Sequence, residues 1–307
     1  MTLLKPPDRP QPHCQLAAAR LYWPAERRGD QPMQPPLETR YLDLLKKTLS
    51  FSLWPEPAVP IDTFNLGSTL FRRPIVAAVS RVLARWNLKV VKTVQVSAED
   101  KRVGKFHPML AHTMIGQPRL ENVQACVETA LKEGIQGDLI EAGVWRGGSA
   151  ILMRAVLEAH DDRIRRVFVA DSFEGLPKPD PEKFPHDAGD KHYKNRYLAV
   201  SEEEVRENFR SFDLMDDRVI FLKGWFKDTL HVVPSEAFAV IRIDGDMYQS
   251  TIEALSALYP KLSDGGFCIV DDYALKGCRE AVDDFRRDHQ IPVPLTHVDW
   301  TGVFWRK

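Results

Sequence analysis

DLIEAGVWRGGSA, residues 138–150, is the stretch on which the fold depends. Its apolar first half predicts a short buried strand, and the residues from Ser149 to about His160 predict a helix. Glycines fill the turn between them. They let a ligand approach the backbone, and the start of the helix favours negative charge. Any tight strand-to-helix connection can use glycines in this way, so the turn alone leaves ligand binding open.

The same alternation continues through the rest of the chain. Further strands are predicted in RVFVADSF (166–173), RVIFLKG (218–224), FAVIRIDGD (238–246) and GFCIVDDY (266–273). Helices are predicted over 120–133, after the capping-box sequence that begins at Ser201, up to Leu262, and over 278–289. This alternation is typical of an α/β fold with a doubly wound, mostly parallel sheet. THVDWTGVFW (296–305) is too short for a crossover and predicts an antiparallel C-terminal hairpin.

The N-terminal third has a different composition. Half of the 22 prolines lie in the first 60 residues, which predicts a proline-rich arm with one short helix over 38–53. Residues 70–92 predict a second helix with a basic face. Its apolar face carries Ile75, Val79, Val82 and Trp86. Packing of that face on the body, or on another copy in a homo-oligomer, is favoured over a membrane surface. We therefore divide the chain into an arm (1–60), an N-terminal helical extension (61–106) and the sheet domain (107–307).

The overall composition excludes several classes of protein. With 44 % hydrophobic and 28 % charged residues, the chain is neither collagen-like nor a coiled coil. Lys plus Arg (42) balances Asp plus Glu (43), so we expect neither a nucleic-acid partner nor membrane contact. No apolar run is long enough to span a bilayer. The four scattered cysteines and a start unlike a signal peptide predict a cytoplasmic protein.

Acidic residues follow several of the predicted strands. Asp171 and Ser172 lie roughly 20–30 positions after the glycine turn, where doubly wound folds hold ribose hydroxyls. Together with the turn they favour a nucleoside ligand over a simple capping role for Asp171. Both a nicotinamide cofactor and S-adenosylmethionine fit. The missing G-x-G-x-x-G pattern counts against the dinucleotide.

Four more aspartates follow two later strands: Asp244, Asp246, Asp271 and Asp272. We expect them to converge at one edge of the sheet, with no basic run between them. Clustered carboxylates need a cation or protons. Oxygen ligands without histidine or thiolate favour Mg²⁺. Helix capping explains one or two of the four aspartates, but not the whole set.

The segment between Phe173 and Ser201 has no core periodicity and is long enough to form a lid over a site. His186, Asp187, His192 and Tyr193 are its candidate substrate contacts. For any one of them, solvated loop surface is the better interpretation.

Six motifs in this order make the chain recognisable. They are IEAGVWRGGSAILMR (140–154), VADSFEGLP (169–177), LAVSEEEVRENF (198–209), FLKGWFKDTL (221–230), RIDGDMYQST (242–251) and GGFCIVDDY (265–273). Over about residues 107–307 the chain resembles the macrocin O-methyltransferase family, with a weaker likeness at YLDLLKKTL (41–49). These are metal-dependent sugar O-methyltransferases of macrolide and aminocoumarin antibiotic biosynthesis. The resemblance leaves 55–105 without a motif.

The resemblance implies a class I methyltransferase domain over 107–307 that binds S-adenosylmethionine and Mg²⁺, and a small glycosylated substrate. Asp244, Asp271 and Asp272 would hold the metal, and Asp246 would be the general base. The implied donor site comprises Thr113, Met114, Glu141, Gly143, Trp145, Ser149, Asp171, Ser172, Phe173, Gly224, Trp225 and Phe226. His112 belongs to the same implied segment as Thr113.

Two other functions stay open at this point. A catechol-like phenol is an alternative acceptor, because the same metal logic would serve it. A non-catalytic nucleoside-binding module is a more distant alternative, because it gives no reason for four aspartates at two strand ends.

Overall fold

A seven-stranded sheet forms the centre of the computed structural model, which describes residues 34–60 and 73–307. The sheet has the order β5-β4-β3-β6-β7-β9-β8. Its strands are β3 (Asp138–Ala142), β4 (Val167–Asp171), β5 (Val219–Lys223), β6 (Phe238–Ile243), β7 (Leu262–Val270), β8 (Thr296–His297) and β9 (Val303–Arg306). The first five are parallel, and β9 runs antiparallel to both β7 and β8. The predicted mostly parallel sheet and C-terminal hairpin are confirmed.

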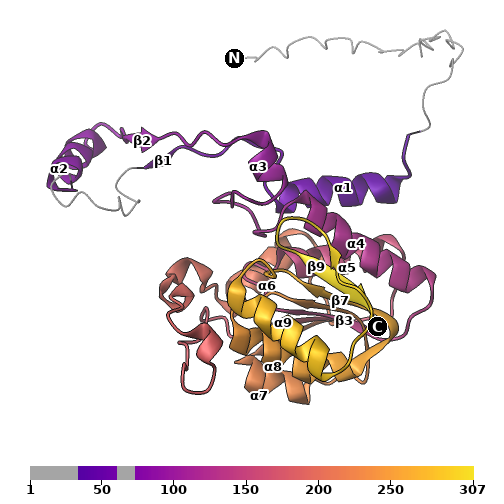
Figure 1. Cartoon of the computed structure of the whole chain (residues 1–307). Coiled ribbons are helices and arrows are strands. Elements are labelled where there is room, and N and C mark those ends of the chain that lie inside the picture. The colour runs from indigo at the N-terminus through magenta and orange to yellow at the C-terminus, as the bar shows by residue number, and fades with distance from the viewer. Residues whose placement is uncertain (1–33, 61–72) are drawn as a thin grey trace, which may run out of the picture. The chain divides into compact units, whose positions relative to one another are not determined.

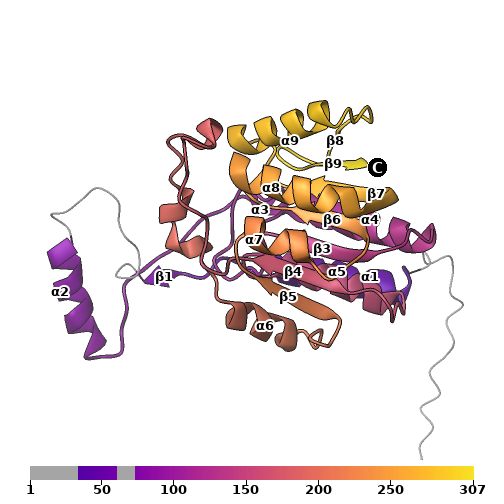
Figure 2. The same cartoon turned by 90° about the horizontal axis from the view of Figure 1, so that it is seen from below.

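Helices cover both faces of this sheet (Figures 1 and 2). One layer contains α1 (Leu37–Leu49), α4 (Gln117–Lys132), α5 (Gly148–Ala159) and α6 (Glu202–Ser211). The other contains α7 (Phe226–Thr229), α8 (Tyr248–Leu258) and α9 (Lys276–Asp288). Each layer packs an apolar core against the sheet, as expected for strands that are buried on both faces.

The order of the parallel strands along the sheet changes direction between β3 and β6. The chain runs from β3 outward to β4 and β5 and then returns to β6, so β3 and β6 are neighbours although far apart in sequence. Open α/β sheets bind ligands beyond the carboxyl ends of the strands at such a switch point. The predicted glycine turn follows β3 and the first aspartate pair follows β6.

Several helix ends differ from prediction. The helix expected to reach Leu262 ends at Leu258, because Pro260 follows and Leu262 already begins β7. The helix expected over 38–53 ends at Leu49 and buries Leu42 and Leu45. Tyr41 and Leu44, two other apolar residues at helical spacing in this helix, are 38 % and 55 % exposed. Ser201 caps α6 as predicted, its Oγ accepting a hydrogen bond from the Glu204 N–H.

The segment before the sheet domain contains short elements. They are β1 (Val59–Pro60), α2 (Arg73–Ala84), β2 (Val91–Lys92) and α3 (Ala98–Arg102). The predicted helix 70–92 is thus too long, because Asn87 takes a positive φ and β2 pairs with β1. Val79, Val82 and Trp86 are each at least 44 % exposed within the described part of the chain.

Residues 1–33 of the predicted arm and 61–72 of the predicted extension lie outside the described residues, and the division into three domains stays a prediction. Cys126, Cys268 and Cys278 are buried and unpaired. Within the described ranges, we find no helix long and apolar enough to cross a membrane.

Candidate active site

A cavity of about 650 Å³ opens at the carboxyl ends of the parallel strands. Its walls include nearly all of the residues that the sequence predicted for the site. They are Thr113, Met114, Glu141, Gly143, Trp145, Ser149, Asp171, Ser172, Gly224, Trp225, Phe226, Asp244, Asp246, Asp271 and Asp272. Residues from five strand ends and one preceding loop are thereby brought to a single hollow.

The glycine turn needs its first glycine for a packing reason. Gly143 has φ +88°, and a Cβ there would lie 1.8 Å from the Asp244 carbonyl oxygen. Since L side chains rarely adopt this φ and have no room here, β3 and β6 can approach only with glycine. The close approach places the start of α5 beside the aspartates after β6.

Asp171 shapes this turn from the neighbouring strand. Its Oδ2 accepts a hydrogen bond from the Val144 N–H at 2.8 Å, and its Oδ1 accepts one from the Phe173 N–H at 2.8 Å. Burial raises the pKa of the Asp171 carboxyl, and these backbone bonds oppose that rise. Asp171 therefore has the capping role that we weighed as an alternative, and it also lines the cavity.

Glu141 lies at the bottom of the site. It is 1 % exposed, and Arg242 Nη1 donates to its Oε1 at 2.5 Å. Its Oε2 is buried and has no hydrogen-bond partner among the residues that the structure describes. Burial raises the pKa of Glu141 to about 8. A buried acceptor of this kind is costly unless a ligand satisfies it.

The aspartates after β6 and β7 form a cluster. One carboxylate oxygen from each of Asp244, Asp271 and Asp272 lies within 4.8 Å of the others. Asp246 has φ +56°, and its N–H donates to Asp272 Oδ2 at 3.1 Å. Positive φ is uncommon for residues other than glycine and tends to concentrate at functional sites. The predicted convergence of the four aspartates is present.

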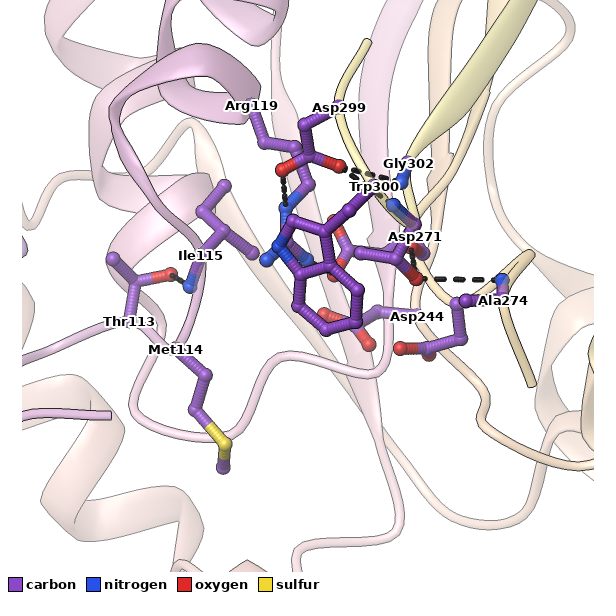
Figure 3. Close-up of polar contacts among 12 residues, drawn as sticks. Thr113, Met114, Ile115, Arg119, Asp244, Asp271, Ala274, Asp299, Trp300 and Gly302 are labelled. Carbon is purple, nitrogen blue, oxygen red and sulfur yellow. Dashed lines mark hydrogen bonds and ion pairs between the residues drawn. The ribbon is translucent and has the colours of Figure 1, made fainter. Parts of the chain in front are cut away.

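No basic run lies between these aspartates in the sequence, but two arginines pair with them in the structure. Arg242 Nη2 donates to Asp271 Oδ1 at 2.6 Å, and Arg242 Nη1 donates to Asp244 Oδ2 at 3.0 Å. Arg119 Nη1 pairs with the other oxygen of Asp271 (Figure 3). Arg242 is a buried residue of β6, a strand that is buried along its whole length. Arg119 is a buried residue of α4. No run of basic residues marks either arginine in the sequence.

Neighbouring charges and burial shift the pKa values of the clustered aspartates in different directions. The two guanidinium groups hold the pKa of Asp271 below its usual range despite burial. Burial and the charge of Asp244 raise the pKa of Asp272 well above normal. The same two causes raise the pKa of Asp246 to about 7. Without a cation the cluster therefore holds protons, and Asp271 stays ionised.

Two residues of the implied donor segments lie elsewhere. Phe173 packs in the core beside Phe221, with ring centroids 6.0 Å apart, and does not line the cavity. His112 stacks edge-on against Phe212 and contributes its backbone carbonyl, which accepts from the Gly148 N–H. Phe173 thus contributes to the core beside the site, and His112 holds the start of α5 through a backbone hydrogen bond.

The long loop before α6 lines part of the cavity, through residues such as Lys178, Asn195 and Tyr197. Of its four candidates, only His192 lines the cavity. Asp187 is buried and accepts from the N–H groups of Tyr248 and Gln249 at 2.7 and 2.9 Å, so it caps α8. His186 stacks on Tyr248, and Tyr193 also lies off the cavity wall.

Several lining residues were not predicted. His107, Arg119, Tyr197 and Trp300 all face the cavity. Tyr197 accepts a hydrogen bond through its carbonyl from Trp145 Nε1 at 3.0 Å, which fixes the loop on the turn after β3. Trp300 lies in the turn between β8 and β9, and only the antiparallel pairing of β9 with β7 brings that turn to this edge. Aromatic residues in a short terminal hairpin gave no signal for that.

Comparison with known proteins shows the family of the chain. The macrocin-O-methyltransferase (TylF) family model matches residues 38–307, a wider span than the motifs indicated. A tetracenomycin-C rhamnosyl 4'-O-methyltransferase of Streptomyces olivaceus is 47 % identical over 87 % of this chain and 92 % of its own length. Mycinamicin III 3''-O-methyltransferase of Micromonospora griseorubida is 48 % identical over 68 % of this chain and 84 % of its own length.

Solved structures agree with the fold. The O-methyltransferase NovP superposes with a TM-score of 0.71 at 41 % identity, covering 88 % of this chain and 99 % of NovP. The calicheamicin methyltransferase CalS11, at 18 % identity and a TM-score of 0.51, covers 79 % of this chain and 99 % of its own and shares the fold. With its match over nearly the whole described chain, this protein belongs to the macrocin O-methyltransferase family and is an O-methyltransferase.

Proposed function

We propose that this enzyme transfers the methyl group of S-adenosylmethionine to a sugar hydroxyl of a small glycosylated natural product, with Mg²⁺ held by Asp244, Asp271 and Asp272. The observation that carries the proposal is the aspartate cluster. Three carboxylate oxygens lie within 4.8 Å of one another on the same cavity as the glycine turn. Donor and acceptor would therefore meet in one hollow.

The donor set fits a hard divalent cation. Carboxylate oxygens are the ligands that Mg²⁺ prefers. Asp271 keeps lone pairs free beside its two arginine bonds, because each oxygen can accept more than one contact. A cation there would also offset the repulsion that raises the pKa values of Asp272 and Asp246.

The opposite half of the cavity fits the donor. The unpartnered Oε2 of Glu141 is an acceptor suited to the ammonium group of the methionine end. The start of α5, at Gly148 and Ser149, favours the carboxylate beside it. Asp171 and Ser172 suit ribose hydroxyls. Trp225 and Phe226 give an apolar wall for the adenine.

The reaction asks little covalent chemistry of the protein. A sugar hydroxyl has a pKa far above 7. Mg²⁺ held by Asp244, Asp271 and Asp272 would lower that pKa and orient the acceptor. Asp246, two residues beyond a metal ligand, accepts the proton as the general base. An oxygen–carbon bond forms as the carbon–sulfur bond breaks, and S-adenosylhomocysteine leaves. Alignment in a closed pocket can contribute roughly 7–11 kcal/mol to such a transfer.

The acceptor class follows from the relatives. The names of two relatives that are 47 % and 48 % identical specify numbered sugar positions on a tetracenomycin rhamnoside and on a mycinamicin. A third, 43 % identical and from Streptomyces niveus, is named for a demethylated novobiocin. We extend a glycosylated acceptor of this kind to the present enzyme.

The test is methyl transfer from labelled S-adenosylmethionine to a panel of acceptors. The panel contains rhamnosylated tetracenomycin, mycinamicin III and, as the alternative class, simple catechols. We expect transfer to a glycoside that EDTA abolishes and added Mg²⁺ restores. Preference for catechols, or activity that survives metal removal, would overturn the proposal. Tight S-adenosylhomocysteine binding in a thermal-shift titration, without transfer to any acceptor, would instead indicate a nucleoside-binding module.

A further inference from the structure

The turn between β8 and β9 carries a tryptophan that the proposed chemistry does not use. Trp300 is 49 % exposed, yet it lines the cavity that holds the aspartate cluster. Because β9 pairs antiparallel with β7, the turn before β9 lies at the edge where Asp271 and Asp272 follow β7. A large aromatic ring is thus placed on the acceptor half of the site.

The turn that presents this ring is fixed by hydrogen bonds. Asp299 Oδ1 accepts from the N–H groups of Thr301 and Gly302 at 3.0 and 2.8 Å. Thr301 Oγ1 donates to the carbonyl oxygen of Asp271 at 3.0 Å. The turn is therefore tied directly to the residue that follows β7, and the ring cannot drift relative to the carboxylates.

Arg119 joins the turn to the aspartate cluster a second time. Its Nε donates to Asp299 Oδ2 at 3.0 Å, and its Nη1 pairs with Asp271 (Figure 3). Its guanidinium carbon lies 5.7 Å from the centre of the Trp300 ring, within the range of a cation–π contact. A Cβ at Gly302 would lie 2.8 Å from Arg119 Cδ, so glycine is needed for the arginine to pass.

The indole nitrogen of Trp300 also has a hydrogen-bond partner in the protein. Trp300 Nε1 donates to the carbonyl oxygen of Val103 at 3.0 Å. The polar atom of the ring is thereby satisfied by the protein, and the exposed part of the side chain is its apolar surface. A rigid, half-exposed aromatic face in a cavity is the arrangement of a binding anchor.

We propose that Trp300 is a specificity-determining residue that receives the C–H face of the acceptor's pyranose ring. A hydroxyl at the aspartate cluster leaves the rest of its sugar ring on this side of the cavity. Sugars expose C–H groups on one ring face and hydroxyls at the edge, so an aromatic plane can bind the face while carboxylates bind the edge. The inference rests on the proposed sugar acceptor and adds the residue that orients it.

Steady-state kinetics of Trp300→Ala with the preferred glycoside of the wild-type enzyme test this role. Loss of a central aromatic anchor typically costs more than 2 kcal/mol, so we expect the acceptor KM to rise about 30-fold. We expect kcat to fall less than about threefold, because the carboxylates keep their partners. The affinity for S-adenosylhomocysteine, measured by calorimetry, should stay within about twofold.

Two further variants separate stacking from structural support. Trp300→Phe keeps an aromatic plane but loses the bond to Val103, so it should recover most of the KM. Trp54→Ala removes a tryptophan that is 45 % exposed and does not line this cavity, and it should leave the KM unchanged. Acceptor titration should also quench the intrinsic fluorescence of the wild-type enzyme more than that of Trp300→Phe.

The outcomes distinguish the two proposals. If the wild-type enzyme methylates no glycoside, the proposed function fails. If it does, and Trp300→Ala keeps the wild-type KM, the role of the ring is refuted while the function stands. Equal damage from Trp300→Phe and Trp300→Ala would likewise overturn stacking, because it would assign the effect to the lost bond with Val103.

Discussion

Replacement of Arg242 by glutamine is the sharpest test of how the site is held together. Arg242 is 1 % exposed and its guanidinium group bonds to three carboxylates, those of Glu141, Asp244 and Asp271. The variant removes the positive charge while keeping a polar side chain. It leaves Asp271 with Arg119 as its remaining charged partner, and it leaves Glu141 and Asp244 without one.

The expected loss of stability follows from these contacts. Removing one partner of a buried ion pair costs about 3–5 kcal/mol, because an uncompensated charge stays in the interior. Three charge-assisted bonds would suggest more, since each contributes about 1.5–3 kcal/mol. Protonation limits the loss, because burial already raises the pKa of Glu141 to about 8. We therefore expect the free energy of unfolding to fall by about 3–5 kcal/mol.

Urea denaturation followed by circular dichroism measures this loss at pH 7 without added cation. Arg166→Gln is the matched control. Arg166 pairs with Asp138 at 2.7 Å but is 37 % exposed, so its loss should cost about 0–1 kcal/mol. Arg242→Lys keeps the charge but loses the fork geometry and should fall between wild type and Arg242→Gln.

A double variant adds a check on the cause. In the Glu141→Gln background, Arg242→Gln should cost less, because one of the carboxylates that it strands is gone. If the free energy of unfolding of Arg242→Gln lies within about 1 kcal/mol of the wild-type value, the carboxylates do not depend on this arginine. Our description of the charge balance would then be wrong.

Two other predictions concern single aspartates. Asp246→Asn should lower kcat by about 10²–10⁴-fold, as expected on loss of a general base, with S-adenosylhomocysteine affinity unchanged in calorimetry; a change below about tenfold would remove its assigned role. Asp216 pairs with Arg154 at 2.6 Å and with Arg218 at 2.8 Å, which lowers its pKa to about 2. A carboxyl whose pKa is lowered by folding stabilises the fold at a pH above its normal pKa of about 4, and this stabilisation is lost as the pH falls toward 2. Asp216→Asn should therefore lower the free energy of unfolding by about 1 kcal/mol at pH 7, after allowance for its partial exposure. Urea titrations at pH 7 and pH 2.5 would contradict this if the difference from wild type stayed constant.

Local patterns in the sequence were sufficient to predict the parallel strands and the cavity residues that directly follow them. Short apolar runs ended in glycine or aspartate, and parallel strands place such ends at one edge. That reasoning brought Gly143, Asp171 and the four later aspartates to one cavity before any contact was known. Phe173, which the resemblance implied for the donor site, does not line the cavity. Its neighbour Ser172 does, because adjacent residues of a turn can face opposite sides.

The N-terminal helices show the limit of periodicity. In α1, both Leu44 and Leu45 fit a helical apolar stripe, but only Leu45 is buried. The stripe predicts a helix, while the neighbour against which it packs decides which of two adjacent residues turns inward. In 70–92 the periodicity continued past the point where Asn87 adopts a positive φ and the backbone changes direction.

The charge of the site was the part that the sequence concealed most. Four aspartates at two strand ends are visible as motifs. Arg242 begins one of those motifs without any sign that it pairs with the aspartates, and Arg119 lies outside all six motifs. Arg242 is one residue of an apolar strand, and Arg119 lies 152 positions before its partner Asp271. Because a buried carboxylate must be paired or protonated, such partners are required by physics even when no motif shows them. A cluster of acidic strand ends should therefore be taken as a prediction of buried arginines as well, and here both carboxylate oxygens of Asp271 pair with one.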